Sequence, residues 1–233
     1  MYRTLDVWLQ RLQWPIGIMA AAWLPIIAWA CLRLAKTVWQ APFHTLLFLG
    51  GIGLFVLSWR WIFRFQQVGL WLMRAEHEAT HLLFAVLTAH PIVGWSRQSK
   101  QGSYIRFLGQ GNWLIQIAPY FFPTAAIVLW LLALLIPFGS LLGLTSLALG
   151  FATGFHVVST WREIYRDRHE LLALSSKFCW LFLPSANLLM LGGLIAYSQD
   201  GFRRLATFLG DVLFPLSWMV GVVWSWVAAS VLG

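Results

Sequence analysis

Charged residues are scarce in this chain. Lys, Arg, Asp and Glu together make up 10% of its 233 residues, whereas soluble domains carry roughly 25%. This scarcity excludes an ordinary soluble domain. Hydrophobic residues make up 60% of the chain, and its mean hydropathy is +0.72. We therefore predict an all-α polytopic membrane protein.

Cysteines and acidic residues are also few. The two cysteines, Cys31 and Cys179, lie in apolar segments, which argues against a disulfide framework and against a zinc site built from cysteines. Eight acidic residues against sixteen basic ones give a net charge of +8. The basic residues cluster in the connections between apolar stretches, so we assign them to membrane topology and lipid head groups. No basic face on a soluble fold is visible, and we expect no nucleic-acid partner.

Long apolar stretches make up most of the chain. About 20 apolar residues span a membrane, and six or seven stretches near that length can be marked, at residues 14–34, 42–63, 68–87, 112–137, 141–160, 178–197 and 205–232. The polar interval 90–111 contains four glycines and short β-compatible pieces, which predicts a small β-hairpin. The fold class that we predict is thus a bundle of about six or seven membrane helices with one hairpin after the third.

The third apolar stretch contains the string His77-Glu78-Ala79-Thr80-His81. Residues four apart project on nearly the same side of a helix, so the two imidazoles can converge on one cation. Glu78 points about 100° around from His77, where it can take a proton from metal-bound water. Ionisable groups inside an apolar span are costly and mark a functional site. The alternative is a polar tie between helices, which does not require this spacing. The string predicts one Zn²⁺ per chain, with Glu78 as general base.

Catalytic zinc usually has three protein ligands, and His156 is the third ligand that depth in the membrane favours. If the spans alternate in direction, stretches 68–87 and 141–160 end on the same side. At 1.5 Å per residue, His81 then lies about 14 Å and His156 about 9 Å from that surface. Glu170 and Asp167 are alternative carboxylate ligands if their segment folds back into the membrane. Glu163 and Glu170 follow His156 at seven-residue steps, and a solvated charged face is the other interpretation of this segment.

From His77 to Pro123 the chain resembles the site-two protease family of intramembrane metalloproteases. The likeness rests on the His-Glu-x-x-His helix and the glycine-containing interval after it, including the strings Gly109-Gln110-Gly111-Asn112-Trp113 and Ala118-Pro119-Tyr120. It extends loosely through residues 150–172 and so covers about half of the chain. The resemblance implies that His77 and His81 bind zinc, that Glu78 is the general base and that the hairpin presents substrate as an extended strand.

The chain departs from this family in one respect. Members commonly supply the third ligand as an aspartate in an Asn-Pro-Asp-Gly or Leu-Asp-Gly motif, and neither motif occurs here. The string Leu183-Pro184-Ser185-Ala186-Asn187 has a proline and an asparagine but no aspartate. No region is long enough for a PDZ domain, so substrate selection falls to the hairpin, the loops or a partner.

Together these observations predict a zinc-dependent intramembrane endopeptidase in the inner membrane of a bacterium. Its partners would be the lipid bilayer and a transmembrane protein or peptide as substrate. We expect one integral membrane domain over residues 1–233, with N-terminal spans at 1–66, the metalloprotease core at 67–172 and C-terminal spans at 173–233. Two alternatives stay open: a non-catalytic membrane scaffold or adaptor that retains a metal site, and an ion transporter lined by His and Glu. Inverted repeats would favour the transporter, and the sequence contains none.

Overall fold

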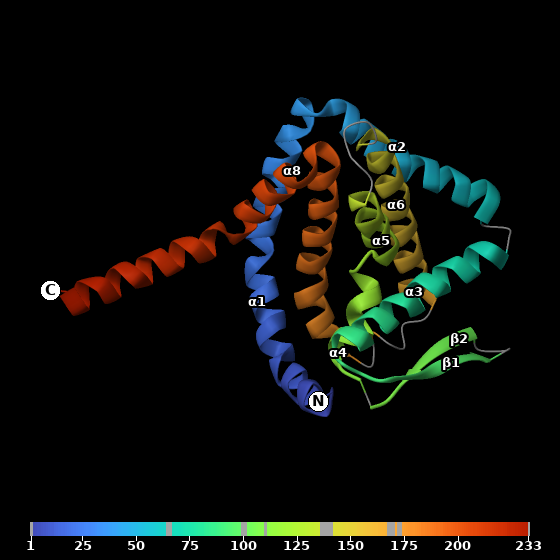
Figure 1. Ribbon diagram of the computed structural model, residues 1–233, viewed down its shortest axis with the longest axis horizontal. Helices are drawn as coiled ribbons and strands as arrows, with labels where there is room; N and C mark the ends of the chain where they lie inside the picture. The colour runs from blue at the N-terminus through green and yellow to red at the C-terminus, as the bar shows by residue number, and fades with distance from the viewer. Residues whose placement is uncertain are drawn as a thin grey trace.

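The structure is a computed structural model that describes residues 2–63, 67–98, 102–109, 111–135, 142–166, 171 and 174–232. These residues form seven α-helices and one two-stranded sheet (Figure 1). The helices are α1 (Tyr2–Lys36), α2 (Pro42–Ser58), α3 (Gln67–Leu87), α4 (Trp113–Ile117), α5 (Thr124–Leu134), α6 (Leu142–Arg166) and α8 (Ser176–Leu232). The strands are β1 (Ile92–Gln98) and β2 (Gly102–Phe107). Two short 3-10 helices, η1 (Thr37–Gln40) and η3 (Ala118–Tyr120), and one short π-helix, η2 (Trp59–Phe63), complete the described elements.

Four helical segments are long and apolar enough to cross a membrane, or five if a bent pair counts as one span. They are Tyr2–Gln40, Pro42–Trp61, Leu142–Tyr165 and Ser176–Phe214, with the bent pair of α4–η3 and α5 as the fifth. The number of six or seven spans is therefore not reproduced among the described residues. The third predicted span, α3, carries three charged residues, and the fourth bends by 81° near Pro119 and Pro123.

The sixth and seventh predicted spans lie on one element, α8. Its helical dihedral angles break at Asp200 and Gly201, where Gly201 has φ +59°. A side chain is strained in this left-handed conformation, which glycine adopts without steric cost. The part of α8 before this break lies alongside α1. Phe208 and Val212 after the break also pack on α1, and the C-terminal end of α8 extends away from the other helices (Figure 1).

A second helix pair, α2 and α6, packs closely along its length (Figure 1). The contact is made at two glycines. A Cβ atom at Gly51 would overlap the backbone of Leu147 and Phe151, and one at Gly150 would overlap the backbone of Phe48. Small residues at a helix interface allow the backbones to approach, which is a common way for membrane helices to associate. This pair holds α6, whose C-terminal half faces α3.

The interval after α3 contains the two strands. β1 and β2 are antiparallel, from the Ile92–Phe107 pair to the Gln98–Gly102 pair. After β2 the chain turns at Gly109 and Gly111, which have φ +106° and +75°. The extended residue Asn112 then begins α4, because its side-chain oxygen accepts hydrogen bonds from the N–H groups of Leu114 and Ile115. This is the ordinary N-cap arrangement of a helix.

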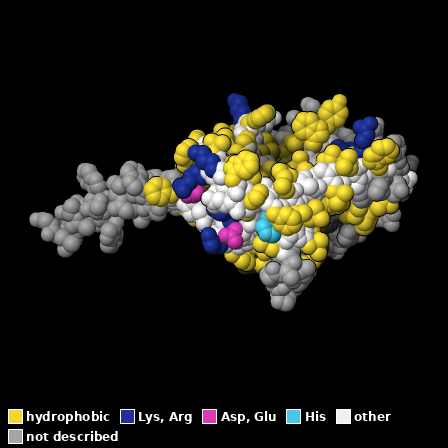
Figure 2. Space-filling view, turned by 90° about the horizontal axis from the view of Figure 1, so that it is seen from above, with side chains coloured by type: hydrophobic (Ala, Val, Ile, Leu, Met, Phe, Trp, Pro, Cys, Tyr) yellow, Lys and Arg dark blue, Asp and Glu magenta, His cyan; other side chains and the backbone are white. Residues whose placement is uncertain are grey.

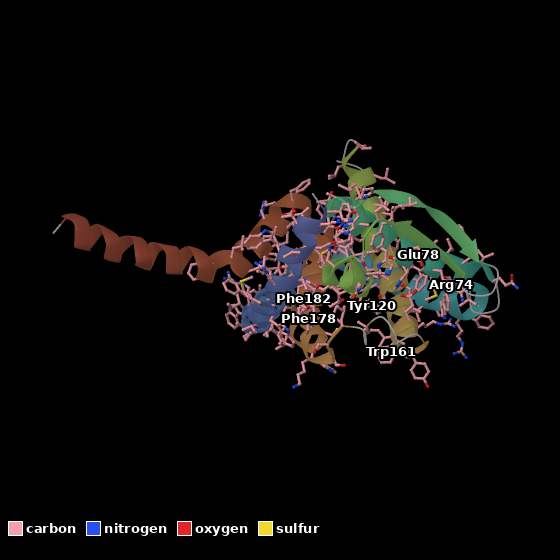
Figure 3. The ribbon with its side chains drawn as sticks, turned by 90° about the horizontal axis from the view of Figure 1, so that it is seen from below. Arg74, Glu78, Tyr120, Trp161, Phe178 and Phe182 are labelled. Atoms are coloured by element: carbon pink, nitrogen blue, oxygen red, sulfur yellow. The ribbon has the colours of Figure 1, made fainter. Side chains whose placement is uncertain are left out.

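An aromatic cluster fixes α4 against α8. The centroid of the Trp113 ring lies 5.0 Å from that of Phe178 and 5.5 Å from that of Phe182. Its indole N–H donates to the Leu9 carbonyl at 2.7 Å. Phe178 and Phe182 stack on each other (Figure 3). α4 is thereby held between α1 and α8, with α3 on its other side.

The outer surface is largely apolar, as the hydrophobic side chains in Figure 2 show on one face. Large exposed hydrophobic residues occur on all the long helices, among them Trp29 on α1, Leu46 on α2 and Val157 on α6. Such an exterior is unfavourable in water and suits an integral membrane protein, in which lipid covers these side chains.

Candidate metal centre

Helix α3 places His77 and His81 one turn apart on the side that faces α4 and α6. Their Nε2 atoms lie 2.9 Å apart, and the ring centroids are 4.6 Å apart with the planes at 77°. The two imidazoles therefore direct the same nitrogen of each ring at one point, as the spacing of the string predicts. The ring of Tyr120 on η3 packs edge-on against His77, with the centroids 5.8 Å apart.

The other nitrogen of His81 is held by a backbone carbonyl. Nδ1 of His81 lies 2.8 Å from the oxygen of Ile115 on α4. In a continuous helix this oxygen would accept from the N–H of residue 119, but Pro119 has no N–H. The proline thus leaves the carbonyl available, and His81 donates to it.

The other nitrogen of His77 is held by a carboxylate. Nδ1 of His77 lies 2.5 Å from Oε2 of Glu163 on α6, and the two side chains are 12% and 22% exposed. The sequence interpretation did not assign Glu163 to the site. Its one sequence signal is its position seven residues after His156, on the same stripe of the helix.

These partners determine the state of the two rings. A carbonyl and an ionised carboxylate only accept hydrogen bonds, so each Nδ1 carries the proton. Each Nε2 of a neutral ring then has a lone pair, and two lone pairs 2.9 Å apart repel each other. A positive charge between them, either a proton or a metal cation, removes this repulsion. Two nitrogen ligands on a tetrahedral zinc ion lie about 3.3 Å apart, so a small opening of the pair fits the ion.

Metal-bound histidines commonly donate their second N–H to a carboxylate or a backbone carbonyl, which fixes tautomer and orientation. Both types of partner are present here. The donor set of His77 and His81 therefore fits zinc as two of its ligands. No third His, Cys, Asp or Glu joins them into a metal-binding group within the described ranges.

His156, the third ligand that the sequence favours, pairs with a different residue. It is 4% exposed on α6, and its Nδ1 lies 3.6 Å from Oε1 of Glu76 on α3. Glu76 also accepts from the Ser159 hydroxyl at 3.1 Å and from the Ala125 N–H at 3.4 Å. The structure thus brings His77 and His81 together and places His156 in a separate buried cluster. The alternative ligands Asp167 and Glu170 lie outside the described residues.

Glu78 is half-buried and follows His77 directly on α3. Figure 3 shows it with Arg74 on the same helix, and Tyr120 lies further toward the aromatic cluster. One residue corresponds to about 100° of helix rotation, so Glu78 flanks the imidazole pair and does not point along it. This is the position expected of a proton acceptor beside a metal.

A polar network ties this region to the N-terminus of α1. Asp6 accepts from Nδ2 of Asn112 at 2.8 Å, and its second oxygen lies 3.1 Å from Nε2 of His90. His90 follows α3, and Asn112 caps α4, so one carboxylate connects both elements that hold His81. The sequence alone did not indicate any role for Asp6.

Comparisons of the chain with protein-family models, with curated proteins and with solved structures find no match. The resemblance to the site-two protease family therefore rests on the residues named above.

Proposed function

We propose that this chain is a zinc-dependent intramembrane endopeptidase that hydrolyses peptide bonds of membrane-embedded substrates. One observation carries the proposal: the Nε2 atoms of His77 and His81 face each other at 2.9 Å, while a carboxylate and a carbonyl hold both Nδ1 atoms. A simple polar tie between helices would not need both rings turned toward one point. Zinc at this point supplies Lewis-acid activation of water and of a peptide carbonyl.

The residues of the chain would divide the work. His77 and His81 hold the ion, and Glu163 and the Ile115 carbonyl keep the two rings in the tautomer that ligation requires. Glu78 takes a proton from the attacking water and returns it to the leaving amine. A substrate helix must unwind locally, because its internal hydrogen bonds hide the peptide carbonyl from attack.

The third ligand and the cellular membrane are predictions of the sequence. His156, Asp167 and Glu170 are each testable by alanine substitution and metal analysis of the purified protein. The ligand is the residue whose loss lowers the zinc content. Location in the inner membrane of a bacterium would be tested by fractionation of the source cells.

The test of the function compares the unchanged chain with Glu78→Gln and His77→Ala. Each is expressed in the same bacterial host, and the new protein N-termini in the membrane fraction are identified by N-terminal labelling and mass spectrometry. Zinc per chain is measured on the purified proteins. We expect cleavage inside apolar segments with the unchanged chain only, full zinc in Glu78→Gln and reduced zinc in His77→Ala.

The outcomes separate the alternatives. Full cleavage by Glu78→Gln would remove this residue from the mechanism, and unchanged zinc in His77→Ala would remove the metal site. Bound zinc without any new N-terminus would favour the scaffold, and metal-driven flux in liposomes without cleavage would favour the transporter.

A further inference from the structure

A cavity of about 640 Å³ lies between α6, the first turns of α8 and Tyr120 of η3. Its size lies within the range of about 300–1,000 Å³ that is usual for small-molecule sites. Its walls are mainly apolar, and the polar side chains among them include His156, Thr160 and Asn187. The metal pair lies on the other side of Tyr120, because this ring lines the cavity and also contacts His77.

One nitrogen in this wall has no partner. His156 is 4% exposed and lines the cavity, and its Nε2 makes no hydrogen bond within the described part of the chain. Its Nδ1 faces Glu76, whose oxygens also accept from Ser159 and Ala125. The two nitrogens lie on different sides of the imidazole ring. Because Nδ1 faces Glu76, Nε2 points away from it. A buried polar atom without a partner is rare and calls for an explanation.

The charges around the cavity limit what can bind there. None of the described residues that line it is Lys, Arg, Asp or Glu. The Glu76 carboxylate lies behind the imidazole, and its negative charge disfavours an anionic head group. A neutral group that both donates and accepts, such as a hydroxyl, can pair with Nε2 whether or not that nitrogen carries a proton.

Two of the residues that line the cavity are exposed tryptophans. Trp161 and Trp180 line it and are 74% and 80% exposed. Trp161 lies at the outer edge of the molecule in Figure 3, whereas Tyr120 lies further inside. The two tryptophans belong to the segments Leu142–Tyr165 and Ser176–Phe214, which are both apolar enough to span a membrane. Because lipid would cover exposed side chains on such segments, a molecule that passes these tryptophans would enter the cavity from the bilayer.

We propose that this cavity binds a neutral amphiphile with one hydroxyl head group and an apolar chain. The hydroxyl pairs with Nε2 of His156 after the imidazole turns this buried nitrogen toward the cavity, and the chain lies along the apolar wall of α6 and α8. This site is separate from the metal pair and does not depend on peptidase activity. It also requires that His156 is not a zinc ligand.

Cys179 provides a reporter, because it lines the cavity while Cys31, the other thiol of the chain, does not. In a Cys31→Ser background, reconstituted in phosphatidylcholine nanodiscs, the rate at which a membrane-permeant maleimide modifies Cys179 is measured. The probes are 1-dodecanol, dodecane and dodecanoate. We expect protection by 1-dodecanol at concentrations about 2- to 12-fold lower than by dodecane, as expected for one hydrogen bond, and the weakest protection by dodecanoate.

Two variants test the role of the imidazole. In His156→Leu, 1-dodecanol and dodecane should protect Cys179 equally. Leu183→Trp, which narrows the cavity and leaves His156 in place, should weaken protection by both. Equal protection by the alcohol and the hydrocarbon in the parent protein would overturn the proposal. So would stronger protection by dodecanoate, better protection by an apolar peptide, or loss of zinc in His156→Leu.

Discussion

His77 on α3 and Glu163 on α6 lie 86 residues apart in the sequence, and their Nδ1 and Oε2 atoms lie 2.5 Å apart. This contact joins the helix that carries the His-Glu-x-x-His string to the helix that packs on α2. The orientation of one imidazole therefore depends on the packing of two other helices.

Glu163→Ala should weaken zinc binding, because His77 loses the carboxylate that fixes its tautomer. Loss of such a partner typically lowers metal affinity about 10- to 100-fold. Glu163→Gln keeps a hydrogen-bond acceptor but loses the charge. Its zinc affinity should lie between that of the unchanged protein and that of Glu163→Ala. Zinc affinity would be measured by competition with a chromophoric chelator.

The matched control is Asp200→Asn on α8, which removes a carboxylate paired with the exposed Arg203. This variant should bind zinc like the unchanged protein. If Glu163→Ala also does so, Glu163 does not support the ligand.

Asn112→Ala should destabilise the protein, because α4 loses its N-cap. The loss of such a cap costs about 0.5–2 kcal/mol. Asn112→Ser keeps a capping oxygen but loses the amide that donates to Asp6. Thermal unfolding in detergent should therefore rank the unchanged protein first, Asn112→Ser second and Asn112→Ala last. Equal stability of the two variants would show that the cap contributes nothing measurable.

Asp6→Ala should loosen the contact between α1 and the end of α3. The substitution leaves His90 and the amide of Asn112 without their acceptor, and the His90 side chain is fully buried. An unpaired buried donor costs about 1–3 kcal/mol. Hydrogen exchange followed by mass spectrometry should show faster exchange in residues 88–92 and 111–117. Arg3→Ala, three residues earlier, is the control, and equal exchange in both variants would contradict a role for Asp6.

The sequence predicted the helical membrane class and the convergence of the two imidazoles, because both depend on local patterns. Apolar composition follows from counting residues, and the i, i+4 spacing fixes the relation of His77 to His81 on any helix. The supports of the rings were not predictable in the same way. Glu163 reaches His77 only through the packing of α6 on α3, and no local pattern encodes that contact.

The number of spans was harder to predict for a similar reason. Hydropathy alone does not show whether an apolar stretch runs straight. α4 and α5 bend by 81°, and α8 continues through a break that looks like a loop in the sequence. His156 illustrates the limit for sites: its expected depth is close enough to that of His81 for the two to meet, but in the structure its Nδ1 faces Glu76.

Gly150→Ala should destabilise the pair of α2 and α6 and lower the yield of folded protein. The added Cβ atom overlaps the Phe48 backbone, which cannot move as a flexible side chain can. Overpacking of this kind costs about 1–3 kcal/mol, while the better helix propensity of alanine returns about 1 kcal/mol. The steric cost should therefore exceed the gain in helix propensity.

Gly53→Ala on α2 is the control, because nothing lies within 4 Å of its added Cβ. Gly53→Ala should melt at the same temperature as the unchanged protein or higher. If Gly150→Ala were as stable as this control, the close contact of α2 and α6 at Gly150 would not contribute to the stability of the protein.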